Sequence, residues 1–173
     1  MEIRRITPEE FGGKEFRYRY ETDGYYDIQK TDSGFCVEKK TLAEPETVDD
    51  PAYMLEDWME DPVAFGAFEN GELIGFTDGY FEAWNGRFWI TNLHVFESVS
   101  RGRGIGSALL QKMLDSAAQT NARAVMVETQ NGNVRALNFY RKHGFAWIGF
   151  DLYFYSDTDP EKRNIRVLLS KEL

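Results

Sequence analysis

Cysteine is almost absent from the chain: Cys36 is the single one and cannot form an internal disulfide. Disulfides persist mainly in oxidising compartments, so we expect a cytoplasmic protein. Cys36 lies in a strand-like run, and we interpret it as a packed thiol rather than a nucleophile. The sequence also lacks a signal peptide and an apolar run long enough to cross a bilayer. We therefore expect no membrane partner.

Basic residues are outnumbered by acidic ones, 20 Lys and Arg against 29 Asp and Glu, which gives a formal net charge of −9 at pH 7. This balance argues against nucleic acid as a partner, because binding to phosphates needs clustered cations. It is compatible with a cationic substrate. We expect no metal cofactor. The length of 173 residues and the hydrophobic content of 42% suit one domain, residues 1–173, with its own core.

The stretch 88–114 reads as a strand, a loop and a helix. Residues 88–96 are dense in aromatic and branched side chains, as a buried strand requires. From Ile105 to about Gln119, apolar residues recur at helical spacing. Between the two elements, glycines alternate with arginines in the order Arg101, Gly102, Arg103, Gly104, Ile105, Gly106.

Glycine lets main-chain N–H groups approach a ligand closely, and a helix that begins there adds the positive end of its dipole. The loop therefore predicts an anion site suited to phosphate. A tight connection that happens to use glycine is the alternative. The loop lacks a Walker lysine, and its glycines do not follow the dinucleotide-binding spacing.

The remaining pattern predicts an α+β order, with mostly antiparallel strands before the central helix and β-α-β-α-β in the C-terminal half. We expect strands at 16–20, 25–30, 35–41, 62–68, 72–82, 122–129, 146–155 and 165–169, helices at 52–60 and 134–142, a helix start at Thr7-Pro8, and a surface loop at 44–51. The pairs Asn70-Gly71 and Asn85-Gly86 predict tight turns between strands.

Two motifs resemble the GCN5-related N-acetyltransferase (GNAT) family. Arg101, Gly104 and Gly106 match its pyrophosphate-loop pattern, and residues 133–145 match N-x-x-A-x-x-F-Y-x-x-x-G-F. The resemblance implies a GNAT fold, a central mixed and mostly antiparallel sheet of about seven strands flanked by about four helices. It also implies an enzyme that uses acetyl-CoA as co-substrate.

A narrower resemblance, to streptothricin acetyltransferases, lies in residues 83–85, 127–131 and 149–155. Those enzymes carry a pattern such as Ile-Glu-Asp in the central strand. This chain has Ile90-Thr91-Asn92 there and so lacks the acidic residue.

The GNAT resemblance implies which residues contact acetyl-CoA. They are the central-strand residues Leu93, His94 and Val95, the loop and helix start Arg101, Gly102, Arg103, Gly104, Ile105, Gly106 and Ser107, and Asn133, Ala136 and Tyr140 after the next strand. Asn133 also suits a helix N-cap. Packing into the core is the alternative for Tyr140, and solvent exposure for Arg101 and Arg103.

The implied reaction is direct transfer of the acetyl group to a primary amine, without a covalent acyl-enzyme. Tyr140 is at the family's tyrosine position and is the candidate acid that protonates the leaving thiolate. Glu82 and Glu128 are the favoured candidates for the general base, with Asp78 and His94 also considered.

We expect a small cationic amine as substrate, for example a streptothricin-like antibiotic. The alternatives are a peptide or protein N-terminal acetyltransferase and an acyl-CoA-binding module without turnover. A homodimer is compatible with the sequence, which does not fix the oligomeric state.

Overall fold

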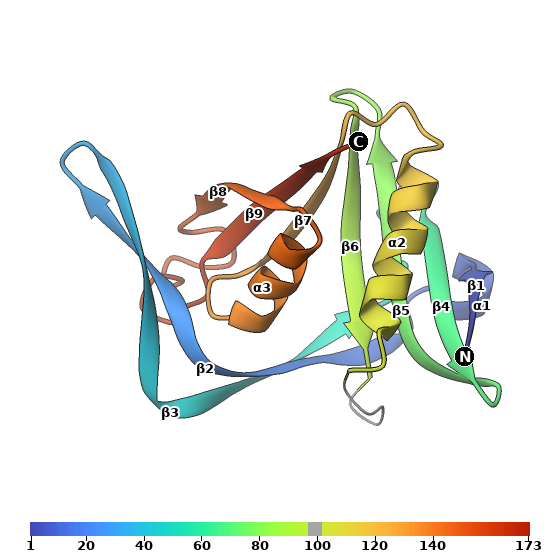
Figure 1. Ribbon diagram of the computed structural model, residues 1–173, viewed down its shortest axis with the longest axis horizontal. Helices are drawn as coiled ribbons and strands as arrows, with labels where there is room; N and C mark the ends of the chain where they lie inside the picture. Colours follow the sequence, from blue (N-terminus) through green and yellow to red (C-terminus); the bar gives the residue numbers. More distant parts are fainter. Residues whose placement is uncertain (97–101) are drawn as a thin grey trace. The chain divides into compact units, whose positions relative to one another are not determined.

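The computed structural model describes residues 1–96 and 102–173, and the chain divides into two compact units (Figure 1). Unit 1 comprises Met1–Tyr18, Pro51–Met126 and Glu172–Leu173, and unit 2 comprises Arg19–Asp50 and Val127–Lys171. A single domain over residues 1–173 stays a prediction. Within the described residues, no helix has both the length and the apolar character that crossing a membrane requires.

The structure has a seven-stranded sheet, a two-stranded sheet and, in its described part, three helices. The larger sheet has the order β1 (Glu2–Ile6), β4 (Val63–Glu69), β5 (Glu72–Glu82), β6 (Arg87–Val95), β7 (Ala124–Gln130), β9 (Arg166–Glu172), β8 (Ala146–Asp151). The smaller sheet pairs β2 (Glu15–Thr31) with β3 (Gly34–Tyr53), and the helices are α1 (Pro8–Phe11), α2 (Ile105–Ala117) and α3 (Val134–Lys142). The pairs β1–β4, β4–β5, β5–β6 and β8–β9 are antiparallel. The predicted α+β class with a mostly antiparallel sheet is confirmed.

In unit 1, α2 lies against β4, β5 and β6 (Figure 1). The helical repeat seen in the sequence is the reason, since Ile105, Leu109 and Met113 are all buried. Ile105 and Leu109 pack with Ala67 of β4 and Ile74 of β5. This packing fixes where the N-terminus of α2 begins relative to the ends of these strands.

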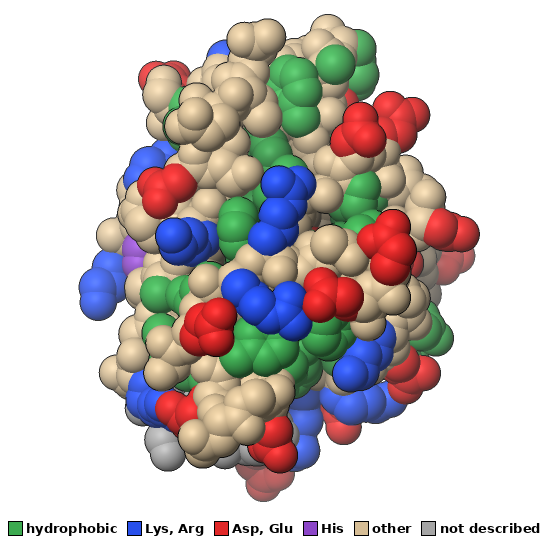
Figure 2. All heavy atoms as spheres, turned by 90° about the vertical axis from the view of Figure 1, so that its right-hand side faces the viewer, with side chains coloured by type: hydrophobic (Ala, Val, Ile, Leu, Met, Phe, Trp, Pro, Cys, Tyr) green, Lys and Arg blue, Asp and Glu red, His purple; other side chains and the backbone are tan. Residues whose placement is uncertain are grey.

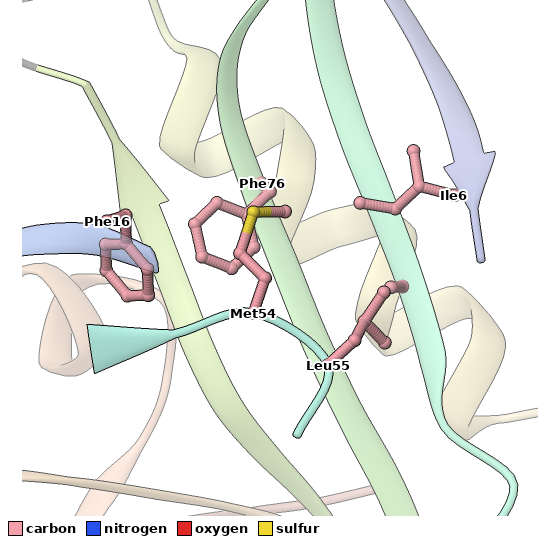
Figure 3. Close-up of a cluster of buried hydrophobic side chains, with 6 residues drawn as sticks. Ile6, Phe16, Met54, Leu55 and Phe76 are labelled. Carbon is pink, nitrogen blue, oxygen red and sulfur yellow. The ribbon is translucent and has the colours of Figure 1, made fainter. Parts of the chain in front are cut away.

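A second cluster in unit 1 joins β1, β2, β5 and the residues that follow β3 (Figure 3). Ile6, Phe16, Met54, Leu55 and Phe76 point toward one another there. The Phe16 and Phe76 rings meet edge to face, with their centroids 4.9 Å apart. Burial of apolar surface therefore holds the start of β2 and the residues that follow β3 against β5.

The predicted helix at 52–60 is wrong, which leaves three helices in the described residues instead of about four. β3 continues to Tyr53, and Leu55 has a φ of 46°, which an α-helix cannot accommodate. The apolar residues of this segment are buried as the pattern indicated, but as an irregular turn rather than as a helical face. The Leu55 N–H donates to Asp78 Oδ2 at 2.9 Å instead of to a helical carbonyl.

The predicted surface loop at 44–51 is also wrong, because these residues continue β3. The predicted strands at 16–20 and 25–30 likewise join into β2. Cross-strand pairing between two long strands holds these polar residues extended, although their composition favours a loop. Most of β3 is exposed, including Cys36, so that the interpretation of Cys36 as a packed thiol is wrong.

Other boundaries agree with the sequence pattern. β5 and α3 begin and end where predicted, and turns occupy Asn70-Gly71 and Asn85-Gly86. β1 was not predicted, because only two of its five residues are apolar. In unit 2, the buried side chains of α3 and β9 include Leu137, Tyr140 and Leu169.

Asp78 is a fully buried carboxyl group at the centre of unit 1. Besides the Leu55 N–H, it accepts a hydrogen bond from Asn92 Nδ2 of β6, at 2.9 Å from Oδ1. The Asn92 amide also donates to the Tyr53 carbonyl at 3.3 Å. Burial raises the pKa of Asp78 to about 6, although these hydrogen bonds act to lower it.

The free energy of unfolding should therefore depend on the ionisation of Asp78. Because the pKa of Asp78 is raised in the folded state, the contribution of this group to the free energy of unfolding is fully present below about pH 4. It is lost as the pH rises through about 6. Relative to Asp78→Asn, the wild type should lose on the order of 2 kcal/mol between about pH 4 and pH 7, since one pKa unit corresponds to about 1.4 kcal/mol. Urea unfolding of both proteins across this range measures the difference.

Asp157→Asn, which removes an exposed carboxylate, controls for the loss of one negative charge. A difference between the wild type and Asp78→Asn that does not change with pH would contradict the assignment.

Candidate active site

The N-terminus of α2 presents main-chain groups where the sequence predicts a phosphate site. Gly102 and Gly104 have φ of 82° and 75°, and a Cβ built at either glycine would meet no atom of the described residues within 4 Å. Gly104 is the N-cap and contributes no side-chain acceptor, while the first helical hydrogen bond runs from Ala108 N to Gly104 O at 2.9 Å. The amides of residues 105–107 precede that bond, as an anion site at a helix start requires. Arg101 lies outside the described residues.

Arg103 is held by Glu69, the last residue of β4. Its guanidinium makes a two-pronged contact with Glu69, with Nη1 at 3.0 Å from Oε2 and Nη2 against Oε1. The contact raises the pKa of Arg103 and lowers that of Glu69. No local pattern indicates this pair, because the two residues are 34 positions apart. It orients the Arg103 side chain and offsets part of its charge.

The central strand β6 contains a bulge. Asp78 of β5 pairs with Asn92 and Gly79 pairs with Ile90, so that Thr91 has no residue opposite it. The irregularity lies two residues before Leu93, and Leu93, His94 and Val95 themselves pair in register with β5.

The His94 ring lies among aromatic side chains, with its centroid 5.0 Å from that of Phe16 and 5.4 Å from that of Phe96. Leu93 and Val95 pack on the side of the sheet that carries Ile105 and Leu109. The central strand therefore separates the two clusters of unit 1.

Glu82, a predicted base, lies at the end of β5. Its Oε2 accepts hydrogen bonds from the Trp89 indole N–H at 3.1 Å and from the Asn85 side-chain amide. Burial acts to raise the pKa of Glu82, but these donors outweigh it and the pKa is below its usual value. Glu82 is therefore ionised at neutral pH and is a weak proton acceptor.

Glu128, the other predicted base, lies on β7 in unit 2. Its carboxylate forms an ion pair with the Arg166 guanidinium, which in turn stacks 3.8 Å from the centroid of the Phe154 ring. The Tyr155 hydroxyl donates to Glu128 Oε1 at 3.4 Å. These contacts orient the Glu128 carboxylate toward residues of the C-terminal segment.

Asn133, Ala136 and Tyr140 lie at and within α3. Asn133 is the N-cap, and its Oδ1 accepts the Ala136 N–H at 3.0 Å, which confirms the predicted capping role. The Tyr140 ring is 7% exposed and contacts the rings of Phe139 and Phe145 edge to face, with centroids 5.4 and 5.5 Å apart. The ring is thus fixed by packing.

Two buried polar side chains of unit 2, Asn131 and Asp159, are not among the site residues that the sequence predicts. Asn131 accepts the Ile165 N–H and donates to the Tyr26 carbonyl, both at 2.8 Å. Asp159 accepts the Ser156 hydroxyl at 2.6 Å and the Tyr155 N–H at 2.8 Å. Both side chains are buried and join main-chain segments. The spacing Ser156-x-x-Asp159, typical of a local side-chain turn, was the one available signal.

The predicted site residues are thus distributed over both units. Unit 1 holds Glu82, Leu93, His94, Val95 and the described part of the loop and helix start, residues 102–107, and unit 2 holds Glu128, Asn133, Ala136 and Tyr140. Within the described ranges, no group of three or more His, Cys, Asp or Glu side chains could hold a metal ion.

Figure 2 shows a face of the molecule on which acidic and basic side chains are interspersed with hydrophobic ones. Mixed charge also occurs around Arg4 of unit 1, which pairs with Glu10 at 3.0 Å and lies over the Phe68 ring at 4.4 Å. A depression of about 710 Å³ is lined by Arg4, Phe68 and Glu69 among others. Its acidic and basic groups offer no single recognisable ligand chemistry.

Comparison with known proteins gives consistent results. Residues 22–145 match the Acetyltransferase (GNAT) family. The chain is 32% identical over 153 residues to a streptothricin acetyltransferase of Streptomyces lavendulae, covering 82% of this chain and 79% of that protein.

Two solved structures share the fold. A nourseothricin acetyltransferase aligns over 99% of this chain and 97% of its own with a TM-score of 0.79 at 24% identity. A Bacillus anthracis protein assigned as a streptothricin acetyltransferase, solved in complex with acetyl coenzyme A, aligns over 99% of this chain and 96% of its own with a TM-score of 0.75 at 19% identity.

The family match covers more than half of the chain, and the Streptomyces relative exceeds 30% identity over most of it. The glycine-rich start of α2 and the Asn133-capped helix contain the two motifs by which the sequence resembles this family. The chain is an acetyl-CoA-dependent acetyltransferase and belongs to the GNAT family.

Proposed function

We propose that this enzyme transfers the acetyl group of acetyl-CoA to a primary amine of a small cationic molecule, a streptothricin-like antibiotic. The observation that carries the proposal is the 32% identity, over 82% of this chain, to a streptothricin acetyltransferase. The net charge of −9 is compatible with a cationic substrate.

The α2 N-terminus suits the diphosphate of the coenzyme. Gly102 and Gly104 leave open space where any other residue would place a Cβ, and the amides of Ile105, Gly106 and Ser107 lie at the positive end of the helix dipole. We assign diphosphate binding to this main-chain cradle. Arg101 and Arg103 are assigned to charge neutralisation, with Arg103 oriented by Glu69.

The remaining cofactor contacts are assigned by the family resemblance. Main-chain groups of Leu93, His94 and Val95 are proposed to bind the pantetheine arm and the thioester, together with Asn133 and Ala136. The Asn133 side chain caps α3 through Oδ1, and its amide nitrogen is the group proposed to bind the pantetheine.

The chemistry begins with removal of a proton from the substrate ammonium, because a protonated amine has no lone pair for attack. We assign this step to Glu128, the predicted base on β7, whose carboxylate is held in place by Arg166 and the Tyr155 hydroxyl. The amine nitrogen then bonds to the thioester carbonyl carbon, and main-chain N–H groups of β6 stabilise the oxyanion. As the C–S bond breaks, the Tyr140 hydroxyl donates its proton to the departing thiolate, and the proton lost from the newly bonded nitrogen restores the hydroxyl, so that the amide and the free thiol are the products.

Acetyl transfer to a panel of amines tests the proposed function. We expect thiol release from acetyl-CoA with streptothricin and with short diamines, at a rate well above that with a peptide bearing a free N-terminus. Colorimetric detection of free CoA measures the release. Preference for the peptide would instead establish an N-terminal acetyltransferase. Binding of CoA in calorimetry without release by any amine would overturn the proposal.

Replacing Gly104 by Ala should weaken the binding of acetyl-CoA about tenfold, because the added Cβ would occupy space assigned to the diphosphate. Calorimetric titration with CoA measures the affinity. Gly13→Ala is the matched control, since Gly13 also has a positive φ, 67°, and no atom within 4 Å of a built Cβ. The backbone strain is then similar in both variants. Equal affinities of the two variants would contradict the cradle.

Replacing Tyr140 by Phe should lower the turnover number at least tenfold while leaving the affinity for CoA within about twofold, because only the proton donor is removed. The ring packs between Phe139 and Phe145 and should stay in place. Steady-state kinetics and calorimetry measure the two quantities. Tyr153→Phe, at an exposed tyrosine of the same unit, is the control. An unchanged turnover number for Tyr140→Phe would remove the acid role.

A further inference from the structure

The end of the β5–β6 hairpin places a carboxylate among aromatic rings. Tyr80 pairs with Trp89 and Glu82 pairs with Arg87, so that these four side chains share one face of the hairpin. The Trp58 ring contacts the Tyr80 ring edge to face, with their centroids 5.5 Å apart and an interplanar angle of 88°. All of these residues belong to unit 1.

Glu82 keeps its negative charge in this setting. Its hydrogen-bond donors are the Asn85 amide and the side chains of Trp89 and Trp84, and all three are neutral. They hold the carboxylate in position and, with a longer-range attraction to Arg87, keep its pKa below the usual value against the effect of burial. Since no donor carries a charge, the carboxylate remains able to attract a cation.

The surrounding rings suit the same ligand. The faces of indole and phenol rings attract ammonium groups, and Trp offers the strongest such interaction. Trp58 is 53% exposed. Trp84, which lies in the turn that connects β5 to β6, is 83% exposed. Large aromatic side chains are costly to leave in water, so their exposure beside an ionised carboxylate is informative about a ligand.

We propose that Glu82, Tyr80, Trp89 and Trp58 form a subsite for an ammonium group of the substrate, distinct from the nitrogen that is acetylated. The proposal rests on the proposed function, because it takes a cationic amine to be the substrate. An ammonium that binds here keeps its proton, whereas the acetylated nitrogen must lose one. The preferred substrates therefore carry at least two amino groups, and Glu82 anchors one of them instead of serving as the base.

The test compares a diamine with a monoamine of equal length. For 1,5-diaminopentane, Glu82→Gln should raise KM about tenfold and leave kcat within about twofold, because an ion pair and its neighbouring rings are lost from binding alone. For pentylamine, which has no second ammonium, KM should change less than twofold. The pH dependence of kcat should match that of the wild type.

Two further variants complete the design. Glu72→Gln removes the same charge from the exposed start of the same strand and should leave the diamine KM unchanged. Trp58→Leu, at an exposed ring whose loss leaves the core intact, should raise the diamine KM about threefold to tenfold and spare pentylamine. This variant retains the test if Glu82→Gln fails to fold, as thermal unfolding by circular dichroism will show.

Calorimetry of 1,5-diaminopentane binding to the enzyme without coenzyme separates the two proposals. Weaker binding to Glu82→Gln than to the wild type supports the subsite even if no amine in the panel is acetylated. A large loss of kcat with both amines and an altered pH profile would make Glu82 the base. Equal effects on both amines, or none on either, would overturn the subsite.

Discussion

The buried carboxyl group of Asp78 is the interaction on which the architecture of unit 1 depends. It accepts the main-chain N–H of Leu55 and the side-chain amide of Asn92, which also reaches the Tyr53 carbonyl. One carboxyl group thus joins the end of β3, the strand β5 and the strand β6 at the bulge around Thr91. A buried carboxyl without donors would be costly, and a buried Leu55 N–H without an acceptor equally so. Because each supplies what the other lacks, the irregular turn after Tyr53 is stable where a helix was expected.

Two carboxyl groups on one face of β5 show how environment divides a single chemical group into two roles. Asp78 is fully buried, and burial dominates, so that its pKa rises to about 6. Four residues later, Glu82 lies at the half-buried end of the strand, and its donors dominate, so that its pKa falls. The first is suited to holding structure, and the second is suited to meeting a cation. Position along the strand, rather than residue type, separates them.

The sequence was informative wherever structure follows from local pattern. The helix predicted at 134–142, directly after Asn133, agrees with α3 to the residue, and Asn-Gly pairs located two turns. It was uninformative where a distant partner decides. The segment 44–51 has the composition of a loop but is held extended by pairing with a neighbouring strand, and Leu55 leaves the helical region to reach Asp78. For the candidate site, the pattern located the glycine-rich start of α2 but not the contact of Arg103 with Glu69, because the ion pair depends on tertiary structure.

Three carboxylates near predicted functional residues differ in what neutralises them. Glu69 is paired with Arg103, and Glu128 is paired with Arg166, so each already has a full positive charge at contact distance. Glu82 is held instead by an amide and an indole, which fix its position but leave its charge uncompensated at short range. A carboxylate that is paired with an arginine attracts a further cation less strongly than one that is held by neutral donors. On the proposals made above, the glycine-rich start of α2 holds the coenzyme, whereas the choice of amine depends on Glu82, the carboxylate that is oriented without an arginine partner.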